Sequence, residues 1–217
     1  MRKKKDLYKG DDWSYNAGMN KNVDKKTTKK NEIIRKSIHV MFEKGYNGTG
    51  VKDLTDAAGI PKGSLYNYFE SKEDYLKEAL YLYYNEMSAK QFNILADKNL
   101  GPLDRIKNFY ATMIEDFEDE CNCRFGCFVG NITQEMGGVS EVIQGVTNEI
   151  HSEIVEKIKS CLTEAVEKGE LSKDKDVDAL AEFIVSSWQG ALLRIKASHN
   201  KKIVDNFYKI LVEVLLK

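Results

Sequence analysis

The chain has 217 residues, with 33 Lys and Arg against 34 Asp and Glu, so its formal net charge is −1. No apolar run is long enough to span a membrane and no secretory signal is recognisable, which argues against the membrane and secreted classes; a cytoplasmic protein is expected. Only 2 prolines are present, apolar residues recur at three- and four-residue spacing, and no segment alternates as a strand. This pattern predicts an all-α fold, with enough residues for a small domain and one larger core.

The charges are unevenly distributed along the chain. Residues 1–72 hold 16 Lys or Arg and 9 Asp or Glu, whereas residues 73–217 hold 17 and 25. A basic first part on an acidic remainder is typical of a protein whose first part approaches nucleic acid. Residues 1–27 have little apolar content, so we expect a disordered basic tail. Either its lysines add salt-sensitive affinity for DNA, or translation starts at Met19.

A pair of short helices joined by a tight turn is predicted next. Thr49 or Gly50 can cap the first helix, which covers residues 51–58. Gly59 follows where the chain must take a left-handed turn, and Pro61 suits the first turn of the second helix. This is the arrangement of a helix-turn-helix unit, whose second helix enters the DNA major groove. The alternative is a helical hairpin without a DNA role.

The second short helix carries side chains suited to DNA. Leu65 is expected to face the core, which leaves basic, hydroxylic and amidic side chains pointing outward or along the helix edge. Such groups contact phosphates and base edges. They are Lys62, Ser64, Tyr66, Asn67 and Tyr68.

The same segment carries a longer motif. Residues 59–73 read G-x-x-K-G-S-L-Y-x-Y-F-x-S-K-E without a gap, and the segment resembles the DNA-binding region of the TetR family of bacterial transcriptional regulators. The resemblance implies a recognition helix at Lys-Gly-Ser-Leu-Tyr, an aromatic pair that touches DNA, and a Lys72 that meets a phosphate. Two positions depart from the family pattern: Thr55 replaces a common Ala, and Gly50 replaces a capping Thr or Ser. The candidate DNA-binding residues are Thr49, Lys62, Gly63, Ser64, Tyr66, Asn67, Tyr68 and Lys72.

The other helices are placed by apolar periodicity and by capping and stop residues. Gly45 is the expected stop of the first helix, Ser71 with Asp74 resembles a capping box, and Gly169 follows a long helix. Expected spans are 28–44, 71–95, a helix beginning at Pro102, 125–136, 140–168, 176–198 and 201–216. About nine helices match the TetR layout. We therefore expect a DNA-binding domain at 28–74 and a ligand-binding and dimerisation domain at 75–217.

The last two helices favour a homodimer. Residues 201–216 carry two neighbouring apolar lines, an arc broader than one core contact requires. Two antiparallel helices of this kind can pack on their own core and on a second copy. The alternative is that both helices are central in a monomer. The candidate interface residues are Leu192, Ile195, Tyr208, Leu211 and Leu215.

The same domain carries aromatic residues interleaved with polar ones, as small-molecule sites do; the alternative is an ordinary packed core. Residues 124–131 contain the element G-C-x-x-G-N, which resembles a TetR branch that includes the regulator of N-ethylmaleimide reductase and regulators of multidrug exporters. There the element opens the sixth helix, beside the ligand cavity. By position it points to Gly126, Cys127, Gly130 and Asn131. The candidate pocket residues are Phe109, Tyr110, Met113, Phe117, Cys127, Asn131, Gln134, Glu135 and Trp188.

Three cysteines cluster near this element. Cys121, Cys123 and Cys127 lie within seven positions of each other, next to Arg124, which can lower a thiol pKa. The favoured interpretation is unreactive packing, with a thiol switch for electrophiles or oxidants second. A metal site comes last, because the spacing is not a zinc pattern and no His lies nearby in sequence. We therefore expect no metal site.

The preferred function is a homodimeric, TetR-type repressor that occupies a double-stranded palindromic operator. An effector, apolar or aromatic, would shift the helix that starts at Ser71 and release the DNA. The alternatives are a repressor that senses electrophiles through Cys127 and, more distantly, an all-helical Cys-dependent enzyme. The enzyme would need a base, yet His39, His151 and His199 are scattered singly. No catalytic residue, cofactor or membrane partner is expected.

Overall fold

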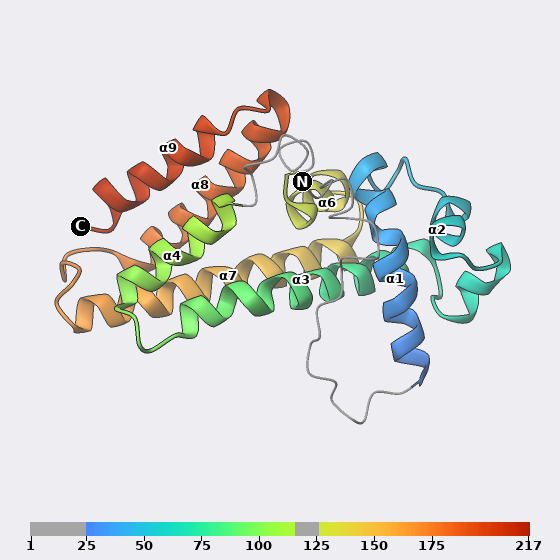
Figure 1. Cartoon of the computed structure of the whole chain (residues 1–217), viewed down its shortest axis with the longest axis horizontal. Helices are drawn as coiled ribbons and strands as arrows, with labels where there is room; N and C mark the ends of the chain where they lie inside the picture. Colours follow the sequence, from blue (N-terminus) through green and yellow to red (C-terminus); the bar gives the residue numbers. More distant parts are fainter. Residues whose placement is uncertain (1–24, 116–125) are drawn as a thin grey trace, which may run out of the picture. The chain divides into compact units, whose positions relative to one another are not determined.

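The computed structural model describes residues 25–115 and 126–217. Within these ranges every regular element is a helix, which confirms the all-α prediction (Figure 1). The elements are α1 (Lys25–Lys44), α2 (Val51–Ala58), the 3-10 helix η1 (Lys62–Asn67), α3 (Lys72–Ala96), α4 (Pro102–Glu115), α6 (Phe128–Met136), α7 (Glu141–Glu167), α8 (Val177–Ser198), α9 (Lys202–Ile210) and the π-helical η3 (Leu211–Leu215).

Most predicted helix spans agree with these bounds to within a few residues, with differences at two starts. α1 begins at Lys25, so residues 25–27 belong to a helix; the rest of the expected tail lies outside the described residues. α6 begins at Phe128 rather than at residue 125, since Gly126 has a positive φ of 61°, which no α-helix contains.

The described chain divides into two compact units. The first, here called the head, holds the described residues up to Glu86 together with residues 131–147; the second, the body, holds residues 87–130 and 148–217. The expected boundary at residues 74 and 75 does not coincide with this division. α3, α6 and α7 each begin in one unit and end in the other. A single boundary in the sequence therefore does not separate the two units.

The head is organised around the apolar face of α1. Ile33, Ile34 and Ile38 are almost fully buried, as are Leu54 of α2 and Leu65 of η1. α1 also contacts α3. Two ion pairs link them, Lys30 with Glu78 at 2.7 Å and Arg35 with Glu86, whose Nε–Oε1 distance is 2.9 Å. The buried hydroxyls of Ser37 and Tyr75 lie 2.7 Å apart, and burial raises the pKa of Tyr75 well above its ordinary value.

The turn into η1 depends on a glycine. Gly59 ends α2 in the left-handed region at φ 69°, and its N–H donates to the carbonyl of Asp56 at 3.2 Å. The next N–H, from Ile60, donates to the carbonyl of Thr55 at 3.0 Å. These bonds satisfy carbonyls that the end of a helix leaves open, so the predicted glycine stop is confirmed. After η1, Ser71 accepts a bond from the amide of Asp74 at 3.0 Å and starts α3.

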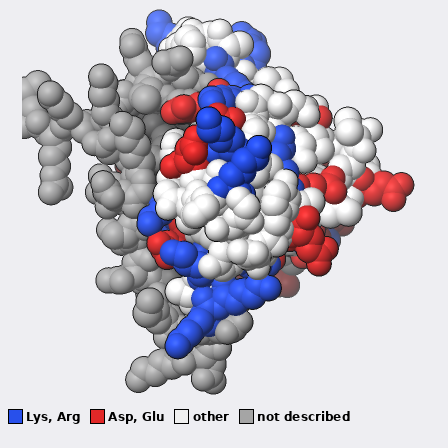
Figure 2. Space-filling model, turned by 90° about the vertical axis from the view of Figure 1, so that its right-hand side faces the viewer, with Lys and Arg blue, Asp and Glu red and all other residues white. Residues whose placement is uncertain are grey.

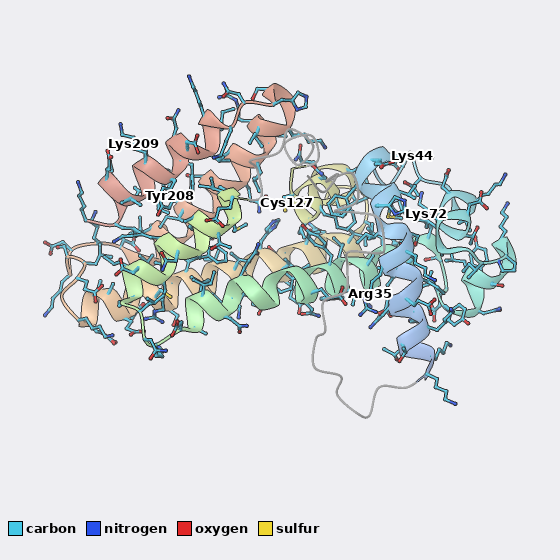
Figure 3. The ribbon with its side chains drawn as sticks, viewed as in Figure 1. Arg35, Lys44, Lys72, Cys127, Tyr208 and Lys209 are labelled. Carbon is cyan, nitrogen blue, oxygen red and sulfur yellow. The ribbon has the colours of Figure 1, made fainter. Side chains whose placement is uncertain are left out.

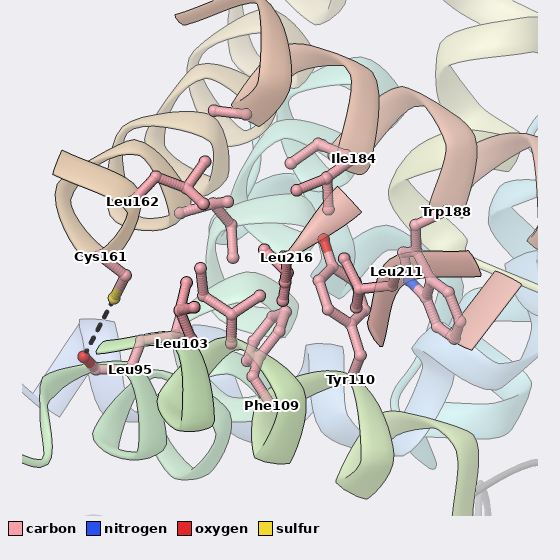
Figure 4. Packing of buried hydrophobic residues seen from close by; sticks show 14 of the residues in the cluster. Leu95, Leu103, Phe109, Tyr110, Cys161, Leu162, Ile184, Trp188, Leu211 and Leu216 are labelled. Atoms are coloured by element: carbon pink, nitrogen blue, oxygen red, sulfur yellow. Dashed lines mark hydrogen bonds between the residues drawn. The ribbon is translucent and has the colours of Figure 1, made fainter. Parts of the chain in front are cut away.

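The body has its own hydrophobic core, built from α4, α7, α8 and α9 (Figure 4). Arg105 is buried there at 2% exposure, donates to the carbonyl of Leu95 at 3.0 Å and pairs with Glu164. Hydrogen bonds from Lys98 and Arg105 hold the pKa of Glu164 well below its usual range. The Sγ of Cys161 donates to the same Leu95 carbonyl at 3.5 Å, as the dashed line in Figure 4 marks. Arg105 therefore ties the end of α3 to α7.

None of the helices in the two described ranges combines the length and the apolar character needed to cross a membrane.

Replacing Gly59 with Ala tests the glycine turn. An added Cβ meets no atom within 4 Å, so the cost arises from the positive φ alone. We expect Gly59→Ala to lower the free energy of unfolding by about 1–2 kcal/mol, measured by urea denaturation. Gly63→Ala is the matched control because Gly63 also has open space around it but no positive φ. Equal stability of the two variants would contradict this account.

Candidate nucleic-acid interface

η1 separates buried from exposed side chains. Leu65 is 0% exposed and Phe69 1%, whereas Tyr66 is 57% exposed. The 3-10 geometry places residues three apart on one line, so Gly63 and Tyr66 share a ridge. An added Cβ at Gly63 would meet nothing within 4 Å, so another molecule can approach the backbone there closely. η1 thus presents Gly63 and Tyr66 to solvent, while Leu65 and Phe69 hold it to the core of the head.

The other candidates on η1 lie beside this ridge. Lys62 and Asn67 are exposed, and Ser64 and Tyr68 are half-buried. Figure 2 views the end of the molecule on which α2 and η1 lie in Figure 1; Lys and Arg side chains spread over the centre of that face, and Asp and Glu lie toward its right edge and also beside the Lys and Arg side chains left of the centre. With Gly63 and Tyr66, six of the predicted DNA-binding residues are therefore available at the surface.

Lys72 is engaged within the head rather than extended into solvent. Its Nζ donates to the carbonyls of Tyr46 and Thr49, both at 2.7 Å, and lies 4.0 Å from the centre of the Tyr46 ring. Figure 3 places it near the carboxyl end of α1, where Lys44 lies. Burial lowers the pKa of Lys72, while the charge of Glu135 opposes that shift. An ammonium has three donors, and the two carbonyls take two of them.

Thr49 does not fit its expected role. Its side chain belongs to the core of the head at 1% exposure, and its hydroxyl donates to the Gly45 carbonyl at 2.6 Å. It also does not cap α2: Gly50 is the capping residue, and its amide donates to the Asp53 carboxylate at 2.8 Å. We therefore correct the assignment of Thr49 from a DNA contact to a core residue.

The expected pocket residues fall into two groups. Phe109, Tyr110 and Trp188 meet in the body, with ring centroids 4.9 Å apart for Phe109 and Tyr110 and 5.4 Å for Tyr110 and Trp188. Phe207 of α9 completes the cluster at 5.1 Å from Tyr110, and Met113 packs against the same core. Phe207 was not among the expected pocket residues, because the apolar residues of the last helix were assigned to its own core and to dimerisation. These rings fill the space between them as a packed core does.

The polar candidates lie elsewhere. Asn131, Gln134 and Glu135 belong to the head, where Gln134 is exposed and Glu135 accepts bonds from the amides of Tyr46 and Asn47. The assignment of these three residues to one pocket with the aromatic rings stays a prediction. Their helix crosses from one unit to the other, and helical periodicity alone does not reveal that. Phe117, Cys121 and Cys123 lie outside the described residues.

Cys127 lies in the body just before α6. Its Sγ accepts bonds from the amide of Gly130 at 3.4 Å and from Nε2 of Gln189 at 3.9 Å. Burial raises the pKa of this thiol, although both bonds act in the opposite direction. Gln189 follows Trp188 on α8, so Cys127 packs beside the aromatic cluster. The thiol is therefore largely protonated at neutral pH.

Three of the five expected dimer residues need correction. Leu192, Ile195 and Leu211 are buried at 4%, 0% and 0% exposure, so they hold α8, α9 and η3 to the core of the body. Tyr208 and Leu215 are half-buried against the same core. Of the two apolar lines on the last helix, the line that contains Tyr208, Leu211 and Leu215 packs against the core of the body. The exposed large apolar side chains of these helices are Phe183, Leu193, Ile210 and Val214.

Comparison with known proteins gives two family matches. A profile described as bacterial regulatory proteins of the tetR family matches residues 33–84, and one described as a tetracyclin repressor-like C-terminal domain matches residues 102–211. The HTH-type transcriptional repressor DhaR of Mycobacterium sp. (strain GP1) is 34% identical over 191 residues, which are 88% of this chain and 94% of that protein. These matches cover both the helix-turn-helix and the body.

Solved structures agree. The regulatory protein TetR from Rhodobacter sphaeroides is 32% identical with a TM-score of 0.75, over 83% of this chain and 95% of that one. Reduced NemR from Escherichia coli is 21% identical with a TM-score of 0.78, over 86% and 96%, and shares the fold. A cysteine mutant of the regulator CifR, solved with 26-bp operator DNA, is 20% identical with a TM-score of 0.73, over 89% and 97%, and likewise shares the fold.

An all-helical chain with an anchored helix-turn-helix and a separate helical body is the architecture of a DNA-binding regulator. The family matches make the assignment specific. The chain belongs to the TetR family of bacterial transcriptional regulators and is a TetR-type transcriptional repressor.

Proposed function

We propose that this repressor binds a palindromic operator as a homodimer through the outer ridge of η1, and that a small molecule bound in the body releases it. The observation that carries the DNA contact is the contrast within η1: Leu65 is fully buried while its neighbour Tyr66 is 57% exposed. A helix that the core holds in place, with an exposed aromatic ring and basic and amide side chains, has the groups that contact phosphates and base edges in a DNA groove.

The contacts divide by chemistry. Lys62 is exposed and suits a phosphate, and the third proton of Lys72 suits another. Asn67 carries the amide that pairs with adenine in the major groove, while Tyr66 and Tyr68 reach backbone or base. Gly63 lets the duplex approach the backbone. Ser64, half-buried, completes the set.

The surface of the last helices supports the dimer. Phe183 and Leu193 on α8 are 56% and 49% exposed, and Ile210 and Val214 on α9 and η3 are 49% and 54% exposed. A second copy offers the same patch and buries all of these apolar side chains by two-fold symmetry. Gly190, with open space around it, allows the helices to approach closely. A two-fold dimer also matches a palindrome with half-sites one helical turn apart.

The aromatic cluster supports an effector that is apolar or aromatic. Tyr110, Trp188 and Phe207 bring three rings together from three helices, α4, α8 and α9. An effector that inserts between them must move at least one of these helices, which gives it different affinities for the two states of the protein. His151 of α7 adds a buried Nε2 that has no hydrogen-bond partner within residues 25–115 and 126–217, and this polar atom can bind an effector in the same body.

A thiol-based mechanism is the second candidate, because Cys127 lies where α6 begins and packs beside the aromatic cluster. Its half-buried thiol, whose pKa is raised by desolvation, is a poorer nucleophile than an activated cysteine. The reversible effector is therefore preferred. The family assignment supports a regulator rather than the Cys-dependent enzyme considered from the sequence.

The basic experiment is selection of an operator. Wild-type protein is incubated with random double-stranded DNA, and bound duplexes are amplified and sequenced. We expect enrichment of one palindrome. Recovery of duplexes without a shared sequence would contradict specific operator binding.

The outer ridge of η1 is tested at Tyr66. Tyr66→Ala is expected to weaken binding to the selected operator by about 1–3 kcal/mol while leaving the dimer intact, because it removes an exposed contact and no core packing. Fluorescence anisotropy with labelled duplex measures the affinity. Tyr66→Phe separates ring from hydroxyl, and Lys77→Ala, on the exposed side of α3, is the control for a head residue outside η1. Unchanged affinity for Tyr66→Ala would remove this residue from the interface.

The dimer surface is tested at Ile210 and Val214. Replacing both with Glu is expected to give folded monomers with reduced operator affinity, because the charges oppose burial between copies but lie outside the core. Light scattering coupled to size exclusion at micromolar concentration reports the mass. Lys202→Glu, also an exposed position, controls for added charge on α9. A wild-type protein that is already a monomer under these conditions would refute the proposal.

Cys127 decides between the two effector mechanisms. Since burial raises its pKa, its reaction with N-ethylmaleimide at neutral pH should be slower than that of a free thiol and should accelerate as the pH rises above the ordinary thiol range. Mass spectrometry after cleavage at Arg124 separates Cys127 from Cys121 and Cys123. Operator release by N-ethylmaleimide in the wild type but not in Cys127→Ser would establish covalent sensing instead.

A further inference from the structure

The loop between α1 and α2 is held from α6. Gly45 ends α1 at φ 73°, and the next two amides, of Tyr46 and Asn47, point at one carboxylate. The Tyr46 N–H donates to Oε2 of Glu135 at 2.8 Å, and the Asn47 N–H donates to Oε1 at 2.7 Å. Glu135 thus binds two consecutive loop amides with its two oxygens, a pair of charge-assisted bonds.

Gly45 is what lets the carboxylate approach. A Cβ added at Gly45 would lie 2.9 Å from Oε2 and 3.2 Å from Oε1 of Glu135. Any other residue at this position therefore meets both a strained φ and a clash with the carboxylate. The glycine that stops α1 also makes room for Glu135.

Lys72 holds the other side of the same loop. Its Nζ donates to the carbonyl of Tyr46 at 2.7 Å, so the N–H of Tyr46 is bound by an anion and its C=O by a cation. A second bond from Nζ reaches the carbonyl of Thr49, just before α2. The loop is therefore fixed between the start of α3 and the last turn of α6, with all of these residues in the head.

The position of Glu135 on α6 gives this contact a further consequence. α6 is one continuous helix whose first residues, up to Gly130, belong to the body, whereas Asn131 onward belong to the head. Glu135 lies five residues beyond Gly130, about 7.5 Å along the helix axis. A shift or rotation of the first turn of α6 is carried by the helix to Glu135. Because both bonds come from one carboxylate, a small displacement breaks both together.

We propose that Glu135 couples the body to the helix-turn-helix by holding or releasing the Tyr46 and Asn47 amides as α6 moves. The proposal rests on the proposed function and assigns a residue to its regulation. It adds a direct route from α6 to the start of α2, separate from the continuous helix α3. Coupling of this kind is reciprocal, so operator binding at η1 must alter the body through the same carboxylate.

The test compares hydrogen exchange in full-length protein with and without the selected operator. Glu135→Gln removes the charge and one acceptor oxygen, and Glu135→Asp keeps the charge but is one methylene too short to reach both amides. Gly45→Ala displaces the carboxylate from the other side. Glu141→Gln, an exposed carboxylate of the same unit, is the control for reduced negative charge near DNA. Exchange of the α1 and α7 core amides confirms that each variant is folded.

In free protein we expect Tyr46 and Asn47 amides to exchange about tenfold faster or more in the three test variants than in the wild type and in Glu141→Gln. We also expect operator binding to change exchange in α8 of the wild type and of Glu141→Gln, and to change it less in the three test variants. Unaltered loop exchange in Glu135→Gln would overturn the proposal.

Two other results would also overturn it. Faster loop exchange with an undiminished response of α8 would show that Glu135 holds the loop without coupling it to the body. Failure of wild-type protein to select any operator would overturn the proposed function and the coupling with it. In that case the loop amides of the DNA-free protein still report whether the Glu135 contact exists, so the two failures are distinguishable.

Discussion

The burial of Leu65 and Phe69 is the constraint on which the DNA-reading surface depends. Both side chains are within 1% of complete burial, and the Phe69 ring meets the Tyr75 ring edge-on at a centroid distance of 5.1 Å. Because Leu65 and Phe69 face the core, the side chain of Tyr66, which lies between them in the sequence, faces the surface. The orientation of the short helix η1 is therefore fixed by the buried side chains of Leu65 and Phe69. It does not depend on a long run of α-helical hydrogen bonds within η1 itself. That explains why the second short helix of the motif can be a six-residue 3-10 helix.

Local signals in the sequence were sufficient for most of the fold. Gly59, Ser71, Pro102 and Asp176 act within one helical turn of themselves, and the helix ends they predict agree with the structure. The boundary between units was not predictable in this way. Contacts between residues far apart in sequence create it, and three helices pass through it, so no change of composition marks the place.

The candidate sites show the same limit at the level of single side chains. The exposed residues of η1 follow from one buried neighbour, Leu65, and were identified from the motif. On α9 and η3 two apolar lines lie side by side, and periodicity does not say which one the core takes. The structure gives the core the line through Val204 and Leu211, which leaves Ile210 and Val214 exposed. Only the packing of α4 and α8 against α9 decides between the lines, and that information is not local.

Glu135 is the clearest example of a role that sequence patterns cannot show. Its partners are backbone amides 88 and 89 positions earlier, and a backbone amide has no side-chain signature to search for. From the sequence it resembled one polar residue among several in a ligand site. The structure instead joins it to Gly45, whose missing side chain admits it, and through Tyr46 to Lys72, whose charge is opposite. A motif that specifies Lys72 as a phosphate contact therefore describes half of its chemistry, because the same ammonium also fixes the loop that precedes the helix-turn-helix.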